Sequence, residues 1–495
     1  MPLTIQFHIR YSAWHVLYAT LAKFAKSVCD GAPALDLVES VTCILQLMAR
    51  LLEQQPSLDN MFPAAYAEPE AFGRSNPALG KLLGSPAPIK HFLPLLFPIL
   101  SLCGAYSDPP LDMLTAALSC VSYFALAHPT EVWERLQYSD FLPSYAPQEE
   151  AFATGAAGGG MRSALQRILH NTEVPNGEYS MTLAFLDLIS TLLVNCHLSS
   201  PVDGEFHSRH APRTTLSFAA LAPAVDYLRT EVFAYYDGWR YRSVLQRWEI
   251  GTKILAIFAE ILYDTSSDDS VVAMAVAEPG AADAAPFSLK DSLVDAFMHD
   301  GSLHHALLTV IGMGPHAVEA LFAARRTREA QAVEAMIISA FEVLHFLLFD
   351  PSVQEANAAL RTSLLSRTVG GDELSLIAAI ASYINYPYAP RVTVLAVDTL
   401  SQICTISLAS RPSPSILGYF GADAPIFRDT FVNRLKSSAE DEAVRIAILN
   451  LMSTALETQP GLAQLLLNDE VGESGTAKGI AADEKAKAKA KPPPK

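Results

Sequence analysis

Apolar residues recur along this chain three or four positions apart, from near the amino terminus to near the carboxyl terminus. Such spacing places them on one face of an α-helix, and a neighbouring element must cover that face. Three clear examples lie near the start, in the middle and near the end of the chain: Leu37, Val41, Ile44, Leu45, Met48, Leu51 and Leu52; Ile254, Leu255, Phe258, Ile261 and Leu262; and Val444, Ile448, Leu451, Met452, Ala455 and Leu456. The first prediction is therefore a series of amphipathic helices.

Breaks that contain proline or glycine separate the helical stretches, and several supply a cap or a first-turn proline, as Asp350-Pro351-Ser352 does. Alternating stretches such as 3–9 are too isolated to predict a sheet. We therefore expect an all-α protein. The expected helices cover approximately residues 14–29, 35–54, 89–104, 111–127, 161–170, 179–196, 216–236, 241–263, 289–298, 303–312, 316–349, 354–366, 373–384, 391–409 and 441–457.

The helices show no fixed sequence period, which excludes consensus tetratricopeptide or ankyrin arrays. Paired helices of variable length favour an irregular α-solenoid of the HEAT or armadillo kind, built of stacked antiparallel helix pairs. Composition shifts predict five segments. They are amino-terminal repeats (1–142) with a proline-rich insert (55–88), central repeats (143–263), an acidic alanine-rich loop (264–287), carboxyl-terminal repeats (288–468) and a disordered Lys/Pro tail (469–495).

Composition supports a protein with a large core. Half of the residues are hydrophobic and 18% are charged, which excludes bulk disorder. A transmembrane helix would need about 20 apolar residues. The best run, 92–103, is shorter and contains Pro94 and Pro98, so we expect no transmembrane segment. Six cysteines without a CxxC pair predict reduced, mostly buried thiols in a cytosolic or nuclear compartment.

The charge balance argues against direct binding of nucleic acid. The formal net charge is −17, and the stretch from Lys478 onward contributes six lysines and two acidic residues, which leaves −21 for the rest (29 basic and 50 acidic residues). A body this acidic repels phosphate backbones.

No stretch predicts a catalytic, metal or cofactor site. The glycine-rich run 155–163 lacks the lysine of a phosphate-binding loop, and we interpret it as a linker. His299, Asp300, His304 and His305 lack the spacing of a zinc-binding helix, so a helix cap with solvent-facing histidines is the preferred interpretation. His207 and His210 lie in a polar stretch and receive the same interpretation. We therefore expect no enzyme.

The stretch 239–263 is the best candidate for a contact surface. Trp239, Arg242, Arg247 and Trp248 form a candidate peptide-contact set through cation–π and ion-pair interactions. The alternative, which we favour, is that the aromatic rings belong to an inter-helix core and the arginines extend over them. That alternative predicts a loss of about 3–5 kcal/mol for Trp248→Ala. Arg325, Arg326 and Arg328 form a second basic cluster, which we expect on the solvated face of one long helix.

Four groups of residues, in order along the chain, resemble a known family. They are Val132-Trp133-Glu134-Arg135-Leu136 with Asp140-Phe141-Leu142-Pro143; Gly177-Glu178-Tyr179 with Thr182-Leu183-Ala184-Phe185-Leu186; Tyr241-Arg242 with Arg247-Trp248-Glu249 and the helix through Phe258; and Tyr383-Ile384-Asn385-Tyr386-Pro387 with Ala396-Val397-Asp398-Thr399-Leu400. Their order and spacing resemble the large scaffold nucleoporins of the nuclear pore inner ring, of the one-eighty-eight type in preference to its paralogues.

The resemblance implies a structural role at the nuclear pore complex, close to the nuclear envelope. Such proteins are curved solenoids that bind short helical motifs of linker nucleoporins and other nucleoporins, and they support nucleocytoplasmic transport. A stack of amphipathic helices suits this role because its grooves accept the apolar face of a partner helix. The alternative is a soluble HEAT-like transport receptor or cargo adaptor, and nucleotide-dependent binding of a small GTPase would distinguish the two.

Overall fold

The computed structural model describes residues 13–31, 35–61, 86–103, 106, 108–127, 129–139, 141–142, 163–197, 218–263, 289–299, 301–349, 358–369, 374–406 and 415–467. Most of the predicted insert 55–88, the loop 264–287 and the tail 469–495 lie outside these residues. The chain divides into two compact units, Met1–Leu293 and Val294–Lys495, and the division falls within helix α15 (Leu289–His299). The five predicted segments stay a prediction.

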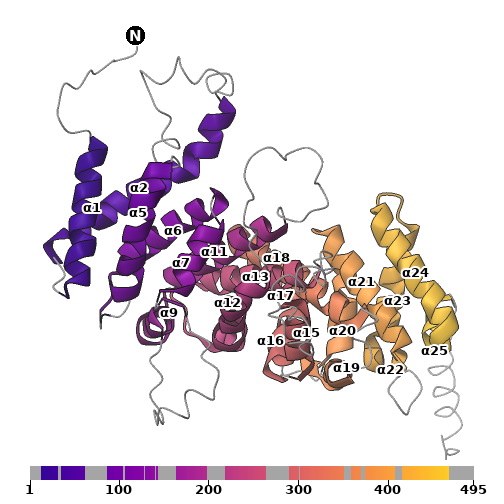
Figure 1. Cartoon of the computed structure of the whole chain (residues 1–495). Coiled ribbons are helices and arrows are strands. Elements are labelled where there is room, and N and C mark those ends of the chain that lie inside the picture. Colours follow the sequence, from indigo (N-terminus) through magenta and orange to yellow (C-terminus); the bar gives the residue numbers. More distant parts are fainter. Residues whose placement is uncertain are drawn as a thin grey trace, which may run out of the picture. The chain divides into compact units, whose positions relative to one another are not determined.

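Unit 1 is built of helices that pack in chain order. Helix α2 contacts α6, α6 contacts α11, and α11 contacts α13, as the indigo to magenta ribbons show (Figure 1). The bounds are α1 (Ala13–Cys29), η1 (Leu35–Leu37), α2 (Val38–Met61), α5 (Pro86–Pro98), η3 (Ile99–Cys103), α6 (Leu111–Ala127), α7 (Pro129–Gln137), α9 (Ala164–Ile168), η4 (Leu169–Glu173), α10 (Val174–Asn176), α11 (Ser180–His197), η6 (Phe218–Leu221), α12 (Ala222–Tyr227), η7 (Leu228–Phe233), η8 (Tyr236–Gly238) and α13 (Val244–Leu262).

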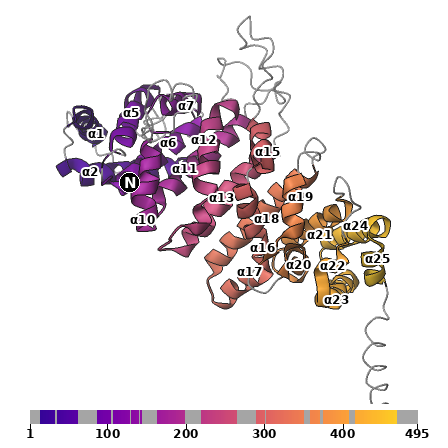
Figure 2. The same cartoon turned by 90° about the horizontal axis from the view of Figure 1, so that it is seen from below.

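Unit 2 repeats the same construction. Helix α18 contacts α16, α17 and α21, and α21 in turn contacts α24. Helices α24 and α25 lie at one edge of this unit in both views (Figures 1 and 2). The bounds are α16 (Gly301–Gly312), α17 (Gly314–Ala323), α18 (Thr327–Phe349), α19 (Ala358–Ser366), β1 (Thr368–Val369), β2 (Leu374–Ser375), α20 (Leu376–Ser382), η9 (Tyr383–Asn385), α21 (Pro390–Thr405), α22 (Leu417–Phe420), η10 (Gly421–Asp423), α23 (Ala424–Lys436), α24 (Glu442–Thr458) and α25 (Pro460–Leu467).

The predicted all-α solenoid class is confirmed. In each unit the apolar stripes form the core between successive helices, as Ile254, Leu255 and Phe258 of α13 show by being fully buried. The described strands, β1 and β2, pair antiparallel over two residues each and leave the class unchanged. Local caps fix several helix starts: Ser163 and Gln166 form a reciprocal capping box at α9, as expected for a Ser-x-x-Gln sequence.

The predicted helices differ from the structure in several places. The expected helix 316–349 is wrong, because the chain turns at Arg325 and divides it into α17 and α18. The expected helix 216–236 is a succession of 3₁₀, α and π turns from η6 to η7. No helix was expected between 410 and 440, where the structure has α22 and α23. In α23 only Phe427 and Phe431 lie in the core together with Ala424, a stripe too sparse to reveal a helix from the sequence.

Among the described helices, α18 is long and apolar enough to cross a membrane, and 61% of its apolar window is buried inside the protein. The pair α16 and α17, bent by 55°, meets the same criterion when the two are joined. A buried core helix passes this test equally well, so the expectation of no transmembrane segment stays a prediction. Among the cysteines, Cys103, Cys120 and Cys404 are buried as predicted, whereas Cys29 and Cys43 are exposed.

Candidate functional site

The start of α13 meets the start of α11 through a close backbone contact. Gly177 ends α10 in the left-handed conformation (φ +73°) and accepts a 2.9 Å hydrogen bond from the backbone N–H of Arg242. A Cβ atom at Gly177 would lie 3.1 Å from the carbonyl oxygen of Arg240 and 3.2 Å from the nitrogen of Arg242. Only glycine combines this φ with this approach. Gly177 therefore positions the residues that lead into α13.

Three aromatic rings gather at this contact, and we call Tyr179, Trp239 and Tyr241 the aromatic cluster. Tyr179 stacks on Trp239 with ring centroids 5.0 Å apart and planes 7° apart, and its centroid lies 4.7 Å from that of Tyr241. The Tyr179 hydroxyl donates to the carbonyl oxygen of Arg240 at 2.9 Å. Burial, with the nearby Glu173 carboxylate, raises the pKa of Tyr179 to about 12. The cluster is thus a neutral, hydrogen-bonded packing unit.

The arginines of the predicted site have partners within the protein. Arg242 forms a 2.7 Å ion pair with Glu178, and both side chains are more than half exposed. Arg247 pairs with Asp237, and its guanidinium lies 4.7 Å from the centroid of the Trp248 ring. Arg247 is therefore held over an aromatic ring, whereas the side chain of Arg242 is held by its ion pair. An exposed pair such as Arg242–Glu178 contributes little to stability, so it can exchange its partner for an acidic ligand at small cost.

The four predicted contact residues take part in three separate interactions: Trp239 stacks on Tyr179, Arg247 lies over Trp248, and Arg242 pairs with Glu178. Their role in binding a peptide stays a prediction. The favoured alternative, an inter-helix aromatic core with the arginines over it, also stays a prediction. Trp239 and Trp248 are partly rather than fully buried, and Arg247 extends over the Trp248 ring. The cost of Trp248→Ala should therefore fall below the predicted 3–5 kcal/mol, a range that fits a fully buried side chain such as Trp133, which is 2% exposed.

Sequence reasoning missed a buried carboxylate beside this site. Glu173 is fully buried at the end of η4 and accepts hydrogen bonds from the N–H groups of Met181 (2.7 Å) and Thr182 (3.2 Å) in the first turn of α11. The Thr182 hydroxyl lies 2.5 Å from its second carboxyl oxygen. Burial raises the pKa of Glu173 to about 7, although these hydrogen bonds oppose the shift. The polar stretch 170–178 indicated only a loop.

Among the predicted histidines of the stretch 299–305, His304 has a structural role. His304 is 4% exposed, and its Nε2 contacts the carbonyl oxygen of Phe297, so the prediction of a solvent-facing side chain is wrong for it. His299 is exposed, with Nδ1 2.9 Å from the carbonyl oxygen of Asp295. Asp300, His207 and His210 lie outside the described residues. Within the described part of the chain, no three His, Cys, Asp or Glu residues are grouped to hold a metal ion.

Unit 1 contains an open groove that no sequence pattern indicated. It has a volume of about 380 Å³ and lies between α12 with the first turn of η7 and the first half of α15. Asp226 and Arg229, which form an ion pair with each other, lie on its wall. The other lining residues are apolar, with one serine: Ala222, Pro223, Val225, Leu289, Ser292 and Leu293. The groove joins elements more than 60 residues apart in the chain, so only the fold reveals it.

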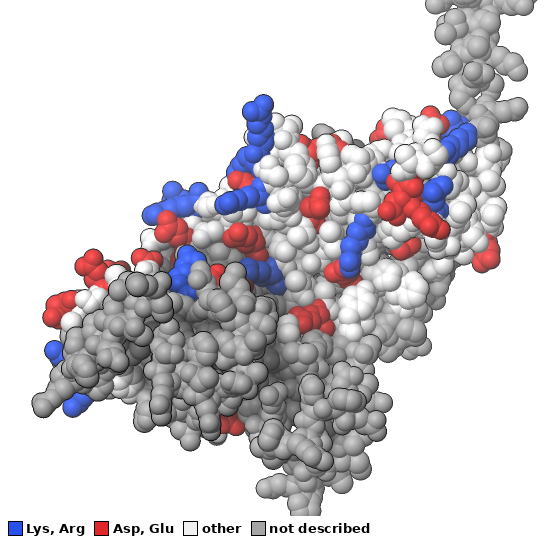
Figure 3. All heavy atoms as spheres, turned by 90° about the horizontal axis from the view of Figure 1, so that it is seen from above, with Lys and Arg blue, Asp and Glu red and all other residues white. Residues whose placement is uncertain are grey.

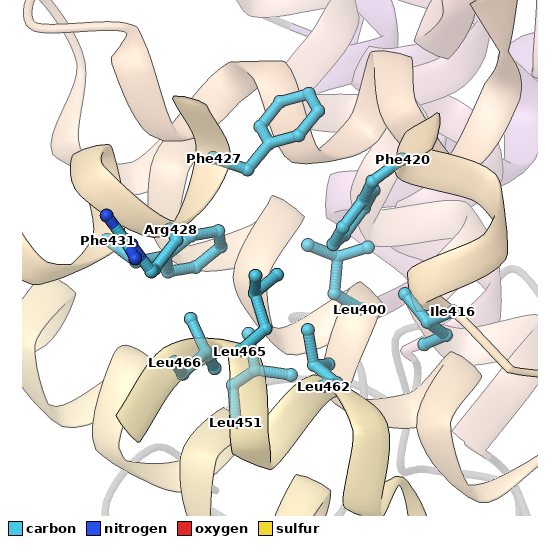
Figure 4. Close-up of a pocket in the computed structure, with 10 residues that line it drawn as sticks. All are labelled: Leu400, Ile416, Phe420, Phe427, Arg428, Phe431, Leu451, Leu462, Leu465 and Leu466. Atoms are coloured by element: carbon cyan, nitrogen blue, oxygen red, sulfur yellow. The ribbon is translucent and has the colours of Figure 1, made fainter. Parts of the chain in front are cut away.

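Unit 2 contains a small, mostly apolar cavity of about 10 Å³, room for about one water molecule. Leucines of α24 and α25 point toward phenylalanines of α22 and α23 around it (Figure 4). It is a packing defect of the core and too small for a ligand. On the visible surface, acidic and basic side chains are intermixed, and no broad area carries one sign (Figure 3).

Stacked amphipathic helices without a described catalytic group define a helical-repeat protein, and the comparison with known proteins places it among the nucleoporins. Residues 4–470 match the family model of nucleoporin Nup188, N-terminal subdomain III. The chain belongs to the Nup188 family, which confirms the predicted one-eighty-eight type. This membership makes it a nucleoporin, a protein of the nuclear pore complex at the nuclear envelope.

Individual relatives agree with the family match. The chain is 28% identical to human nucleoporin NUP188 over 384 residues, 74% of this chain and 19% of that protein. It is 27% identical to nucleoporin NUP188 of Xenopus tropicalis over 372 residues, with the same shares of each chain. Human nuclear pore complex protein Nup205 is 23% identical over 376 residues, 69% of this chain and 17% of that protein. The chain therefore spans about a fifth of the length of the curated relatives it matches.

Proposed function

We propose that this chain is a non-enzymatic scaffold segment of the nuclear pore inner ring that binds short helical motifs of linker nucleoporins. The observation that carries the proposal is the stack of amphipathic helices in each unit, over residues that match the Nup188 family. Helix stacks of this kind offer grooves that accept the apolar face of a partner helix. The 380 Å³ groove beside α12 is one such surface.

The aromatic cluster and its arginines support the same role. Arg242 and Arg247 form ion pairs with the exposed residues Glu178 and Asp237, and Arg247 also lies over the Trp248 ring. Aromatic and arginine side chains dominate binding energy at protein interfaces. We include these four residues as the peptide-contact set of the proposed function, whose partners are other nucleoporins.

The test combines location with partner capture. The protein, tagged at its own gene, should concentrate at the nuclear rim, and the purified chain should retain helical peptides of linker nucleoporins. Scrambled peptides of the same composition provide the control, because they keep charge and hydrophobicity but lose the apolar stripe. Nucleotide-dependent binding of a small GTPase, together with shuttling between nucleus and cytoplasm, would contradict the proposal and favour a transport receptor.

A further inference from the structure

Helix α24 is apolar on two opposite faces. Its inner face buries Val444, Ala447, Ile448, Leu451 and Ala455 against neighbouring helices of unit 2. Its outer face carries Ile446, Leu449 and Leu456, which are 50%, 51% and 58% exposed. Residues three, seven and ten positions apart lie on one side of a helix, so these three form a stripe about 15 Å long. We call them the outer stripe.

Acidic residues lie at both ends of the outer stripe. Glu442 is one turn before Ile446, and Glu457 follows Leu456; both are exposed. Neither forms an ion pair with another residue that the structure describes. Asp441 caps the same end of the helix through the N–H of Ala443 at 2.8 Å. The only basic residue in the helix, Arg445, is half-buried beside the stripe.

The stripe has the composition of an interface. The core face of α24 buries five apolar residues, whereas the outer face has three, separated by the polar Asn450 and Ser453. A narrow apolar centre with a charged rim is typical of a surface that binds another chain. A second copy of this chain would bring an equally acidic rim against the first, and like charges oppose that contact.

We propose that the outer stripe of α24 is the docking surface for an amphipathic partner helix with basic residues at its ends. The ligand needs about three turns, with apolar residues at i, i+3, i+4 and i+7 to cover Ile446, Leu449 and Leu456. Lysine or arginine at its two ends faces Glu442 and Glu457. This proposal deepens the proposed function, on which it rests, by assigning one surface and one partner chemistry.

The test uses a designed helical peptide with four leucines at this spacing and two lysines at each end, and a second peptide with glutamates in place of the lysines. Fluorescence anisotropy with the purified full chain should show binding of the lysine peptide at least about tenfold tighter. Leu449→Glu and Leu456→Glu should each weaken binding about tenfold or more. Leu126→Glu is the matched control, because Leu126 is 53% exposed on α6 and should leave binding unchanged.

A charge exchange sharpens the experiment. In the double variant Glu442→Lys with Glu457→Lys, the preference should reverse toward the glutamate peptide. Equal binding of both peptides, or unchanged binding by the leucine variants with unchanged circular dichroism, would overturn the proposal. So would self-association of the wild-type chain that the leucine variants abolish, since it assigns the stripe to a second copy. Rim localisation that persists in the leucine variants separates a failure of this surface from a failure of the proposed function.

Discussion

Single residues determine how α11 and α13 meet, and Gly177 is the sharpest case. Gly177→Ala should lower the free energy of unfolding by about 2–4 kcal/mol, because a left-handed alanine is strained and its Cβ would press on the backbone of Arg240 and Arg242. Urea unfolding measures the loss. Gly31 has nearly the same φ, +72°, with nothing within 4 Å of an added Cβ, so Gly31→Ala should cost only about 1 kcal/mol. Equal losses in the two variants would contradict the close approach.

Glu173 makes stability depend on pH in an unusual direction. Its pKa in the folded protein, about 7, lies above its ordinary value of 4.5, so between these pH values the folded state holds more protons than the unfolded state. Stability from this residue is therefore full below about pH 4.5 and falls as pH rises through about 7. The total effect is at most about 3–4 kcal/mol, since one pKa unit corresponds to about 1.4 kcal/mol.

Glu173→Gln isolates this contribution. The variant keeps an acceptor for the N–H groups of Met181 and Thr182 but does not ionise. Urea unfolding of both proteins across the pH range should show the wild type losing stability relative to the variant as pH rises. Glu178→Gln is the matched control, because Glu178 is exposed and lies only five residues away. A constant difference between wild type and Glu173→Gln at all pH values would contradict a raised pKa.

At the scale of elements, the sequence predicted the amphipathic helices well where the stripe is continuous. The stripe of Ile254, Leu255 and Phe258 predicts α13 because five or more apolar residues repeat without a break. The sequence failed where the backbone departs from its usual preferences. Nothing in the run Ala324-Arg325-Arg326-Thr327 indicates a helix end, since glycine and proline are both absent.

The α17–α18 turn gives the prediction at this scale. Arg325 adopts φ +60°. Its N–H donates to the carbonyl oxygen of Phe322, and the N–H of Arg326 donates to the carbonyl oxygen of Leu321. This arrangement ends many helices and favours glycine at the position that Arg325 occupies. Arg325→Gly should therefore raise the free energy of unfolding by about 0.5–1 kcal/mol. Arg328→Gly, in the first turn of α18, should lower it by about 0.5–1 kcal/mol. Changes of the same sign in the two variants would show that Arg325 is not strained.

Candidate sites were less predictable than helices for a physical reason. Arg247 and Trp248 adjoin in the sequence, so their contact could be inferred. The stacking of Trp239 on Tyr179 and the groove between α12 and α15 join residues about 60 positions apart, and only packing brings them together. The buried Glu173 gave no signal, because a glutamate in a polar stretch is usually solvated.

At the scale of the whole molecule, net charge separates a protein scaffold from a nucleic-acid-binding protein. The chain carries −17, and its densest basic block is the run from Lys478 to Lys495. Binding to duplex DNA requires several cationic contacts with phosphates and weakens steeply with salt. We therefore expect no measurable binding of a short DNA duplex at physiological salt, by fluorescence anisotropy.

Any weak binding at low salt should come from the basic block 478–495, because the remaining chain carries −21 and repels phosphates. A variant without residues 478–495 should then lose it completely, while a variant in which the same six lysines are arginines should retain it. Binding at physiological salt that survives the deletion would show a basic surface within the folded units and would contradict the exclusion of nucleic acid as a direct partner.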